Sequence, residues 1–589
     1  MPNGLSVKCR SRDGCCEQEA QQPAEDPMMA LGAMAGPLAG AAMPLDAARM
    51  RLAGLAGDLA DGTFVSPESV QRALVELSAA MDPLHEDARL ALVDEILAPL
   101  RGSDPAGEVV LAALAFRHSG ARAALDRLWA AIEAGEWSAE EENFLHWQMV
   151  RLAFLFPQAF DLVQEPRLRR FHRARVMRWN RRINMKCRWL PPERRERRRL
   201  MLVSQQFVNA GHAPTRDLLD YARCLRELDF EVEIVISPEM PRELPMAFPE
   251  PFLANHVARL DGRRRISFEG AEFDCWQIEG AMPHAKGLSR FLRHVASRRP
   301  LVVIGIGGNG IAADLAGRIT TTVTLPLAVR PPVSEATFIA TIGAEHVDGL
   351  GDTAMREELD LAPERFLAFR YAYRLPESGG EVPGERTRLP EDSLLGVIVG
   401  NRLDREISGD NLRLLLACLE AAPRLHLVFV GPFDRFEELA AGHPLLAERA
   451  TALGFQRDVV AVLKRCHLYL NPARAGGGSS VAHALGCGLP VISFTQGDGA
   501  FAAGEAFTVA TEDDYVARLT RWSTDATALA EARAQAARRW AEISDRRASM
   551  AGLMEELGKE RLSRPAQLFA REGAGGGNRP ARHRRHRRS

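Results

Sequence analysis

The residues best suited to chemistry lie in one glycine-rich stretch, HLYLNPARAGGGSSVAHALGCGLPV, at positions 467–491. An apolar run ends in Asn-Pro and is followed by three glycines, two serines and a run of small residues. This pattern predicts a strand, a tight turn and a helix. Glycine lacks a Cβ atom, so the turn can adopt positive φ and approach a ligand closely. A helix start adds unpaired N–H groups and hydroxyls, which are typical of a phosphate site, although a tight turn with a serine cap is the alternative. The residues predicted to bind phosphate are Gly476, Gly477, Gly478, Ser479 and Ser480.

Two arginines follow the first strand expected in the same region. In VGNRLDREIS, residues 399–408, Arg402 and Arg405 come soon after the apolar run LLGVIVG. Ligands of open parallel sheets bind at the carboxyl ends of the strands, where this loop and the glycine loop are both expected. Guanidinium groups beside an amide-lined pocket suit a nucleotide diphosphate leaving group. Surface ion pairs with Asp404 and Glu406 are the alternative interpretation.

The chain that must position these residues has 589 amino acids, which is too long for one ordinary core. Residues 46–165 carry helical periodicity with almost no strand signal, whereas strand and helix signals alternate from residue 200. A polar segment rich in glycine and proline, residues 377–393, predicts a hinge. Six segments are expected: a disordered leader at 1–45, a helical domain at 46–165, a basic helical linker at 166–199, two α/β domains at 200–385 and 386–560, and a disordered basic tail at 561–589.

Charge is balanced over the whole chain but uneven along it. The formal net charge of -2 gives no overall preference for nucleic acid or membrane. Residues 167–199 are densely basic, which leaves three interpretations: a solvated helix face with Trp179 and Trp189 packed inward, contact with an acidic membrane surface or anionic acceptor, or nucleic-acid binding. Nucleic acid ranks last because no DNA or RNA motif accompanies the charge. The nine scattered cysteines fit a reducing compartment, which predicts a cytoplasmic protein, with peripheral contact at the inner membrane face as a further hypothesis.

The C-terminal half resembles a GT-B glycosyltransferase, closest in pattern to glycosyltransferase family four and its group 1 catalytic domain. The similarity covers about 150 residues and includes VGNRLDREIS, LHLVFVG and LGFQRDVVAVLKRCHLYLNPARAGGGSSVAHALGCGLPVISF. It implies an α/β fold of GT-B architecture, with two facing doubly wound Rossmann-like domains, here preceded by an all-α domain. It also implies an enzyme that transfers a sugar from a nucleotide diphosphate sugar, held mostly by the C-terminal domain, to a glycan, lipid-linked glycan or protein.

The resemblance further implies how the reaction would proceed. The nucleotide sugar is a substrate and no cofactor is expected. The sequence contains no Asp-x-Asp pair, so we expect the diphosphate to be held without a metal ion. Retention of anomeric configuration is the default in this family. Arg402 and Arg405, together with the helix that follows the glycine loop, would stabilise the departing diphosphate.

Two stretches of the first α/β domain are expected to border the cleft. QQFVNAGHAPTRDLLDYARCL resembles the first loop and helix of the GT-B N-terminal domain, which places Gly211 and His212 at the cleft. His212 is either a general base or a loop hydrogen bonder. Asn309, in GIGGNGIAADL, would face the acceptor or the sugar and bond a hydroxyl. The glycine spacing of that loop does not match a dinucleotide site.

The chain departs from the family pattern at two positions. The family has two glutamates eight residues apart, and Ala475 and His483 occupy these positions here. The second glutamate commonly binds the ribose hydroxyls. His483 is expected to bind the donor by bonding a hydroxyl, although its neutral imidazole offers one donor and one acceptor rather than two acceptor oxygens. Arg405 is the nearest substitute for a family lysine, and Asp498 or Glu505 could take over hydroxyl recognition. These losses leave open an alternative: a catalytically impaired GT-B-like protein that binds nucleotide sugars or serves as a scaffold.

Overall fold

The computed structural model describes most of the chain between Pro44 and Phe569. The described residues are 6–8, 44–60, 67–81, 84, 86–97, 105–156, 159–160, 164–183, 185–209, 212–342, 361–379, 389–474, 476–566 and 568–569. Gly211, Ala475, residues 380–388 of the predicted hinge and most of the predicted leader and tail lie outside them. The chain forms two compact units. Unit 1 comprises Met1–Leu327, Pro331–Ala368 and Glu556–Ser589, and unit 2 comprises Ala328–Arg330 and Phe369–Glu555.

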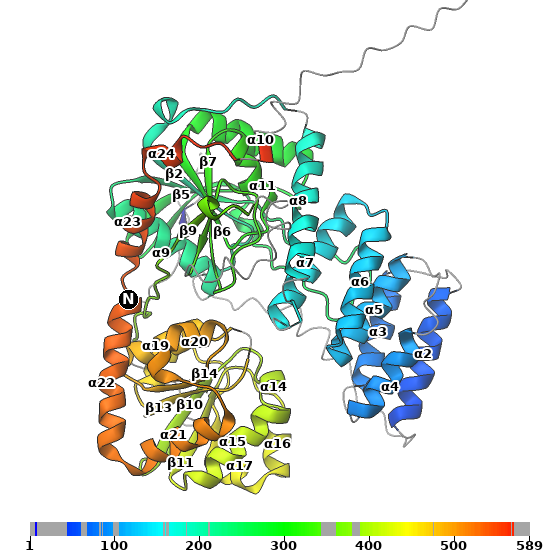
Figure 1. The fold of residues 1–589 in the computed structure, drawn as a ribbon, viewed down its shortest axis with the longest axis vertical. Helices are drawn as coiled ribbons and strands as arrows, with labels where there is room; N and C mark the ends of the chain where they lie inside the picture. Colours follow the sequence, from blue (N-terminus) through cyan, green and yellow to red (C-terminus); the bar gives the residue numbers. More distant parts are fainter. Residues whose placement is uncertain are drawn as a thin grey trace, which may run out of the picture. The chain divides into compact units, whose positions relative to one another are not determined.

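Unit 1 begins with a region that is all helical from α2 to α8 (Figure 1). The start of α7 follows directly from its sequence: Ser138 accepts the backbone N–H of Glu141, and the Glu141 carboxylate accepts the backbone N–H of Ser138, forming a capping box. Trp129 and Phe144 are fully buried in the core of this region. The helices are α2 (Pro44–Ala60), α3 (Pro67–Met81), α4 (Glu86–Leu97), α5 (Pro105–Ser119), α6 (Arg122–Ala134), α7 (Ala139–Leu155) and α8 (Gln164–Ile183).

The basic segment is built into unit 1 more deeply than a solvated helix would be. Trp179 faces inward, as expected, but so do several cations of α8. Arg169 is 3% exposed and pairs with Glu165 at 3.1 Å. Arg175 is 1% exposed, and its guanidinium donates to Oδ1 of Asn143 at 2.5 Å. Buried cations with protein partners are not available to an outside anion, so part of the charge counted in the sequence has a structural role.

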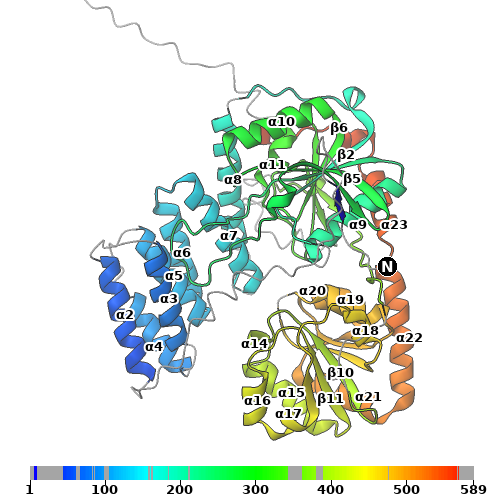
Figure 2. The same cartoon turned by 180° about the vertical axis from the view of Figure 1, so that it is seen from behind.

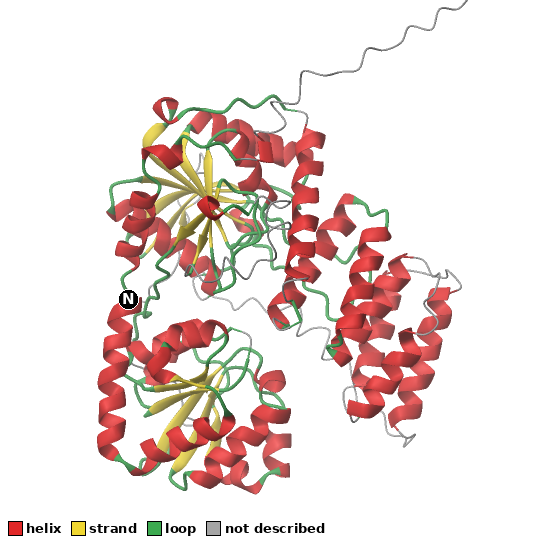
Figure 3. Cartoon of the chain, viewed as in Figure 1, coloured by secondary structure: helices red, strands yellow, loops and turns green. Residues whose placement is uncertain are grey.

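The sheet of unit 1 is mostly parallel, with its helices on both faces (Figures 1 and 3). β2 lies between β3 and β6 and pairs with both in parallel, with Leu200 opposite Val232 and Val302. In sheet order, the strands are β1 (Ser6–Lys8), β4 (Gly262–Phe268), β5 (Ala271–Gln277), β3 (Glu231–Ile236), β2 (Glu196–Ser204), β6 (Pro300–Ile306), β7 (Thr321–Leu325), β8 (Phe338–Thr341) and β9 (Phe366–Ala368). The main covering helices are α9 (Ala213–Glu227), α10 (Ala285–Arg298) and α11 (Ile311–Leu315).

Three boundaries differ from the sequence prediction. β2 begins at Glu196 inside the predicted linker, because its basic first half continues the strand outward from the core and pairs with neighbours such as Glu231. β1 lies inside the predicted disordered leader and pairs antiparallel with β4. The predicted tail begins too early, because α24 (Lys559–Leu562) and Leu568 pack on unit 1, where the Leu562 carbonyl accepts the Thr321 hydroxyl at 2.8 Å.

The sheet of unit 2 is entirely parallel (Figure 2). β10 is central, with Val397 opposite Val428 of β11 and Tyr469 of β13. In sheet order, the strands are β12 (Ala450–Ala452), β11 (Leu425–Val430), β10 (Leu394–Val399), β13 (Leu468–Asn471), β14 (Val491–Phe494) and β15 (Thr508–Val509). The helices are α14 (Leu403–Glu406), α15 (Gly409–Ala421), α16 (Phe436–Gly442), α17 (Pro444–Arg449), α18 (Val459–Leu463), α19 (Gly478–Gly486), α20 (Gly497–Ala503), α21 (Glu512–Thr524), α22 (Ala526–Ile543) and α23 (Arg546–Glu556).

The two sheets confirm the predicted α/β class, and the helices α2 to α8 confirm the all-α region before it. Both sheets reverse their strand order beside the first strand of the unit: between β2 and β6 in unit 1, and between β10 and β13 in unit 2. Loops that leave two such strands diverge, which opens a crevice at the carboxyl edge of the sheet. In the part of the chain that the structure describes, none of the helices is both long and apolar enough to cross a membrane.

Candidate active site

The strand order of unit 2 brings the two predicted phosphate-binding stretches to one edge. α14, with Arg405 and with Arg402 at its N-cap, follows β10. The glycine loop and α19 follow β13, the parallel neighbour of β10. The arginine loop and the glycine loop therefore flank the point where the sheet changes direction, which is the usual ligand position in such folds.

The glycine loop has a backbone that glycine adopts far more readily than other residues. Gly476 and Gly477 have φ values of 82° and 88°, a left-handed conformation that costs about 1–2 kcal/mol in a residue with a Cβ atom. At Gly478 the constraint is space rather than φ. A Cβ atom there would lie 2.8 Å from the Tyr373 hydroxyl and 2.9 Å from the backbone oxygen of Asp498. All three glycines of the predicted phosphate loop thus have a physical reason to be glycine.

The start of α19 is a candidate anion site. Its N-cap, Gly477, supplies no side-chain cap, so the first backbone N–H groups have no partner within the helix. Ser479 and Ser480 lie in the first turn and are partly exposed. The helix is nine residues long, and its positive end and free N–H groups favour an anion at this place.

Arg474 ties the glycine loop to the arginine loop, and the sequence analysis did not single it out. Its side chain is 3% exposed and pairs with Glu406 of α14 at 3.1 Å. It also donates to the carbonyl oxygen of Val399 at 2.7 Å, to Oδ1 of Asn471 at 2.9 Å and to the Tyr469 hydroxyl at 2.8 Å. Its place in the sequence, between the proline that ends the strand and the three glycines, was the one feature that could have indicated a role in the loop. It is a residue that positions the loops rather than one that is exposed to a ligand.

Glu406 links Arg474 to one of the two predicted arginines. Its second oxygen pairs with Arg402 at 3.1 Å, and the Arg402 side chain is 34% exposed. The ion pair proposed as the alternative for Arg402 therefore exists, and it leaves about a third of the Arg402 side chain exposed. Arg405 is exposed on α14, and Asp404 accepts the backbone N–H of Arg435 instead of pairing in the loop.

His483 and the two carboxylates proposed as substitutes occupy different positions, and Ala475 lies outside the described residues. His483 lies on α19, partly exposed, between buried neighbours. Asp498 lies in the first turn of α20, close to Gly478. One of its carboxylate oxygens accepts the backbone N–H of Val329 at 2.9 Å, and burial raises its pKa. Glu505 is exposed in a short 3-10 helix beyond the other end of α20. Of the two predicted substitutes, Asp498 is therefore the one whose backbone and Cβ atom adjoin Gly478, while its carboxylate bonds Val329.

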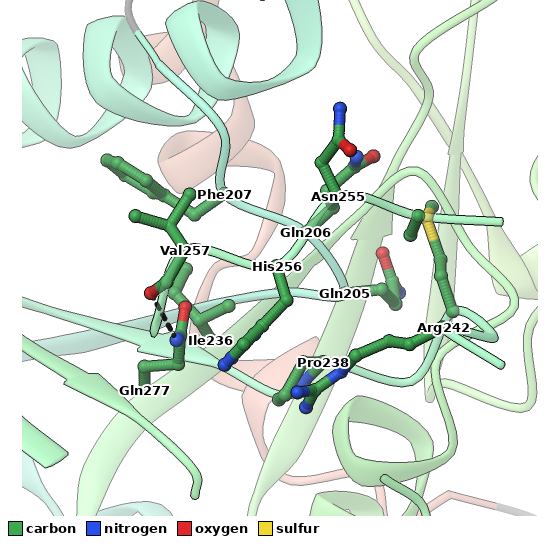
Figure 4. Close-up of a pocket in the computed structure, with 12 residues that line it drawn as sticks. Gln205, Gln206, Phe207, Ile236, Pro238, Arg242, Asn255, His256, Val257 and Gln277 are labelled. Atoms are coloured by element: carbon green, nitrogen blue, oxygen red, sulfur yellow. Dashed lines mark hydrogen bonds between the residues drawn. The ribbon is translucent and has the colours of Figure 1, made fainter. Parts of the chain in front are cut away.

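Unit 1 has a polar pocket at the carboxyl edge of its own sheet (Figure 4). Gln205 follows β2, Pro238 follows β3, and Gln277 ends β5. The amide of Gln277 donates to the carbonyl oxygen of Val257 at 3.0 Å, which holds the opposite wall. His256 also lines this pocket (Figure 4). Gln205, Gln206 and Phe207 of this pocket belong to a stretch that was expected to border the cleft, whereas the wall from Pro238 to Val257 is a long loop without a motif and was not predicted.

His212 and Asn309, which were also predicted on the unit 1 side of the cleft, are not among the residues that line this pocket. His212 caps α9, and its Nδ1 lies 3.0 Å from the Thr215 hydroxyl. Burial lowers the pKa of His212 to about 4, so its imidazole is neutral near pH 7. Asn309 is 7% exposed, and its Oδ1 lies 3.1 Å from Nε2 of His146 on α7. This contact gives Asn309 a structural partner, and its role toward a sugar stays a prediction.

The second glycine loop, before α11, already holds an anion of its own. The buried carboxylate of Glu239 accepts the backbone N–H groups of Ile311 and Ala312 at 2.6 and 2.9 Å. It also accepts the Ser237 hydroxyl at 2.8 Å. Burial raises the pKa of Glu239, whereas these hydrogen bonds act to lower it. A protein carboxyl group thus occupies the position that a phosphate would take at this helix start.

The comparisons with known proteins bear on unit 2 above all. Residues 397–532 match the family model described as glycosyl transferases group 1, a span that contains both loops of the crevice. No curated protein sequence matches the chain. Solved structures with a similar fold include a Thermobaculum terrenum O-GlcNAc transferase variant, with 16% identity over 90% of this chain and 100% of that chain and a TM-score of 0.46. The glycosyltransferase WaaG, involved in lipopolysaccharide biosynthesis, has 14% identity over 61% of this chain and 99% of that chain, with a TM-score of 0.38. A Rickettsia africae glycosyltransferase has 9% identity over 62% of this chain and 100% of that chain, with a TM-score of 0.43.

Proposed function

We propose that this chain, a glycosyltransferase through its group 1 domain, transfers a sugar from a nucleotide diphosphate sugar to a hydroxyl-bearing acceptor. The observation that carries the proposal is the uncapped start of α19, which stands beside two arginines held by one carboxylate, Glu406. This is the arrangement that a leaving diphosphate needs. Metal independence and retention of configuration belong to the proposal as defaults of the resemblance.

The crevice can lower the barrier by stabilising charge. When the bond between the anomeric carbon and the phosphate oxygen breaks, negative charge grows on the diphosphate. The N–H groups at the start of α19, the hydroxyls of Ser479 and Ser480 and the exposed part of Arg402 are fixed before the reaction and face that charge. Arg474 contributes by holding the two loops together. Arg405 is exposed at the rim and would add a long-range favourable potential.

The acceptor class remains a glycan, a lipid-linked glycan or a protein. The polar pocket of unit 1 supplies amides, an imidazole and the guanidinium of Arg242, all of which bond hydroxyls. Membrane contact would depend on the exposed cations of the basic segment, since Arg169 and Arg175 have buried partners. A cytoplasmic location is consistent with the buried free thiols of Cys224, Cys275, Cys418 and Cys466.

A thermal-shift panel of nucleosides, nucleoside diphosphates and nucleotide sugars tests the donor side, because a ligand of the native state raises the melting temperature. Mass spectrometry of nucleoside diphosphate release then tests turnover. Arg402→Ala should abolish both responses. Arg413→Ala should leave both unchanged, since Arg413 is 71% exposed on α15 and pairs only locally with Asp410. Binding without hydrolysis or transfer would favour the alternative, a nucleotide-sugar binder that has lost turnover with the glutamates at positions 475 and 483.

A further inference from the structure

A long loop without helix or strand forms one wall of the unit 1 pocket. Residues 237–257 join β3 to a 3-10 helix at Ala258–Leu260. Structureless stretches of this length are uncommon inside a compact unit and are usually functional. The backbone N–H of Ala254 donates to the carbonyl oxygen of Pro241 at 2.8 Å, which closes residues 241–254 into an Ω-type loop. Both sides of its base line the pocket in Figure 4.

The tip of this loop is inserted into the helical region. Met246, Ala247 and Phe248 are 7%, 2% and 2% exposed and belong to the same apolar core as the helices. The Phe248 ring packs edge-on against Phe144 of α7, with ring centroids 6.1 Å apart. The loop is therefore held from outside the sheet by residues more than 90 positions earlier in the chain.

Side-chain amides from two helices complete the backbone hydrogen bonds of the tip. Gln148 of α7 accepts the N–H of Phe252 at 2.7 Å and donates to the carbonyl oxygen of the same residue at 3.1 Å. Gln71 of α3 accepts the N–H of Phe248 at 3.0 Å. A loop of this kind has no strand partner for these groups, and buried backbone groups without partners are costly. Both glutamines are buried, so each has a defined structural task.

The base of the loop carries the charged and polar groups of the pocket. Arg242 donates from its guanidinium to the carbonyl oxygen of Gly280, and its Nε is buried without a hydrogen-bond partner among the described residues. His256 lies on the other side of the base, with Nε2 at 3.2 Å from Asp261. The buried, unbonded Nε–H of Arg242 and an imidazole oriented by a carboxylate suit an acceptor that carries hydroxyls.

We propose that the helical region sets the geometry of the acceptor pocket by holding this loop, and that Gln148 is a positioning residue that acts through Arg242 and His256. The assignment of the pocket to an acceptor rests on the proposed function. The holding of the loop rests on the contacts alone, so the two can fail separately.

The test uses the full chain and two variants, Gln148→Ala and Gln71→Ala, which remove the amide contacts from different helices. Ser138→Ala is the matched control, because it weakens the start of α7 without touching the loop. Hydrogen exchange of peptides covering 237–257 should become about ten-fold faster in both variants and not in the control. The rate at which diethylpyrocarbonate modifies His256 should change several-fold relative to His443 of unit 2, because the pocket wall moves. Hydrogen exchange of peptides covering residues 394–500 should stay the same, and so should the rate constants of donor-sugar hydrolysis.

Unchanged exchange and unchanged His256 reactivity in both variants would overturn the proposal, as would equal changes in Ser138→Ala. Failure of the proposed function would look different: the unmodified chain would neither bind nor hydrolyse any nucleotide sugar, whatever the loop does.

Discussion

Arg402 and Arg474 share one carboxylate but differ in burial, and this difference predicts opposite results for two alanine variants. Arg474 is 3% exposed and Glu406 is 10% exposed, so Arg474→Ala leaves one oxygen of the Glu406 carboxylate and three further acceptors without their buried partner. Breaking a buried pair from one side costs about 3–5 kcal/mol. For a unit of this size that corresponds to a melting temperature lower by roughly 6–20 °C. Arg402 is 34% exposed, and losing a pair of that kind costs less than about 1 kcal/mol.

The two variants should therefore separate stability from binding. Denaturation followed by hydrogen exchange of peptides from β10 to β14 reports the free energy of unfolding of unit 2 alone. Arg474→Ala should be strongly destabilised, and Arg402→Ala should unfold like the unmodified chain yet lose nucleoside diphosphate binding. Two results would contradict these roles: an Arg402→Ala variant destabilised as much as Arg474→Ala, or an Arg474→Ala variant that kept its stability. Either would mean that Arg474 does not hold the two loops together while Arg402 contacts the ligand.

Three further substitutions probe the loop, a buried histidine and the altered motif. Gly477→Ala places a Cβ atom on a residue with φ 88°, 3.1 Å from Nε of Arg474. The free energy of unfolding, measured by calorimetry, should fall by about 1–2 kcal/mol. Gly552→Ala should show no such loss, because a Cβ atom there meets nothing within 4 Å. Burial lowers the pKa of His212 from 6.5 to about 4, so the unfolded chain binds the extra proton between these values and stability falls as pH falls through this window. From pH 7.5 to about pH 5 the unmodified chain should lose about 2 kcal/mol more than His212→Gln, and equal losses in denaturation curves would refute this. His483→Glu restores an acceptor pair for ribose hydroxyls and should tighten nucleoside diphosphate binding about ten-fold, with no gain in calorimetric titrations for a dideoxy analogue.

The crevice of unit 2 was largely predictable because its signals are local. A strand that ends in Asn-Pro, a glycine triplet and a helix of small residues indicate their own structure, and φ values of 82° and 88° at Gly476 and Gly477 confirm the reason given for glycine there. The alternation of strand and helix signals also predicted two sheets. Local patterns of this kind place residues at the edge of a sheet without any knowledge of long-range contacts.

The remaining features depend on contacts between distant residues. The partners of Arg474 lie up to 75 positions away, so its role as a tether is invisible until β10 and β13 are adjacent. The burial of cations in the basic segment could not be predicted, because sequence does not show that Asn143 meets Arg175. The pocket wall is a loop whose order comes from helices more than 90 residues earlier, which no composition or periodicity reveals. The predicted roles of Gly211 and Ala475 fall outside the described residues.

The central claim is that the start of α19 and Arg402 hold a diphosphate. Its most direct test is calorimetric titration of the full chain with a nucleoside, the matching nucleoside diphosphate and inorganic diphosphate, alongside Arg402→Ala. The account predicts that the diphosphate group tightens binding of the nucleoside at least about 100-fold and that Arg402→Ala removes most of this gain. Equal affinity for the nucleoside and its diphosphate, or a gain that survives in Arg402→Ala, would contradict it.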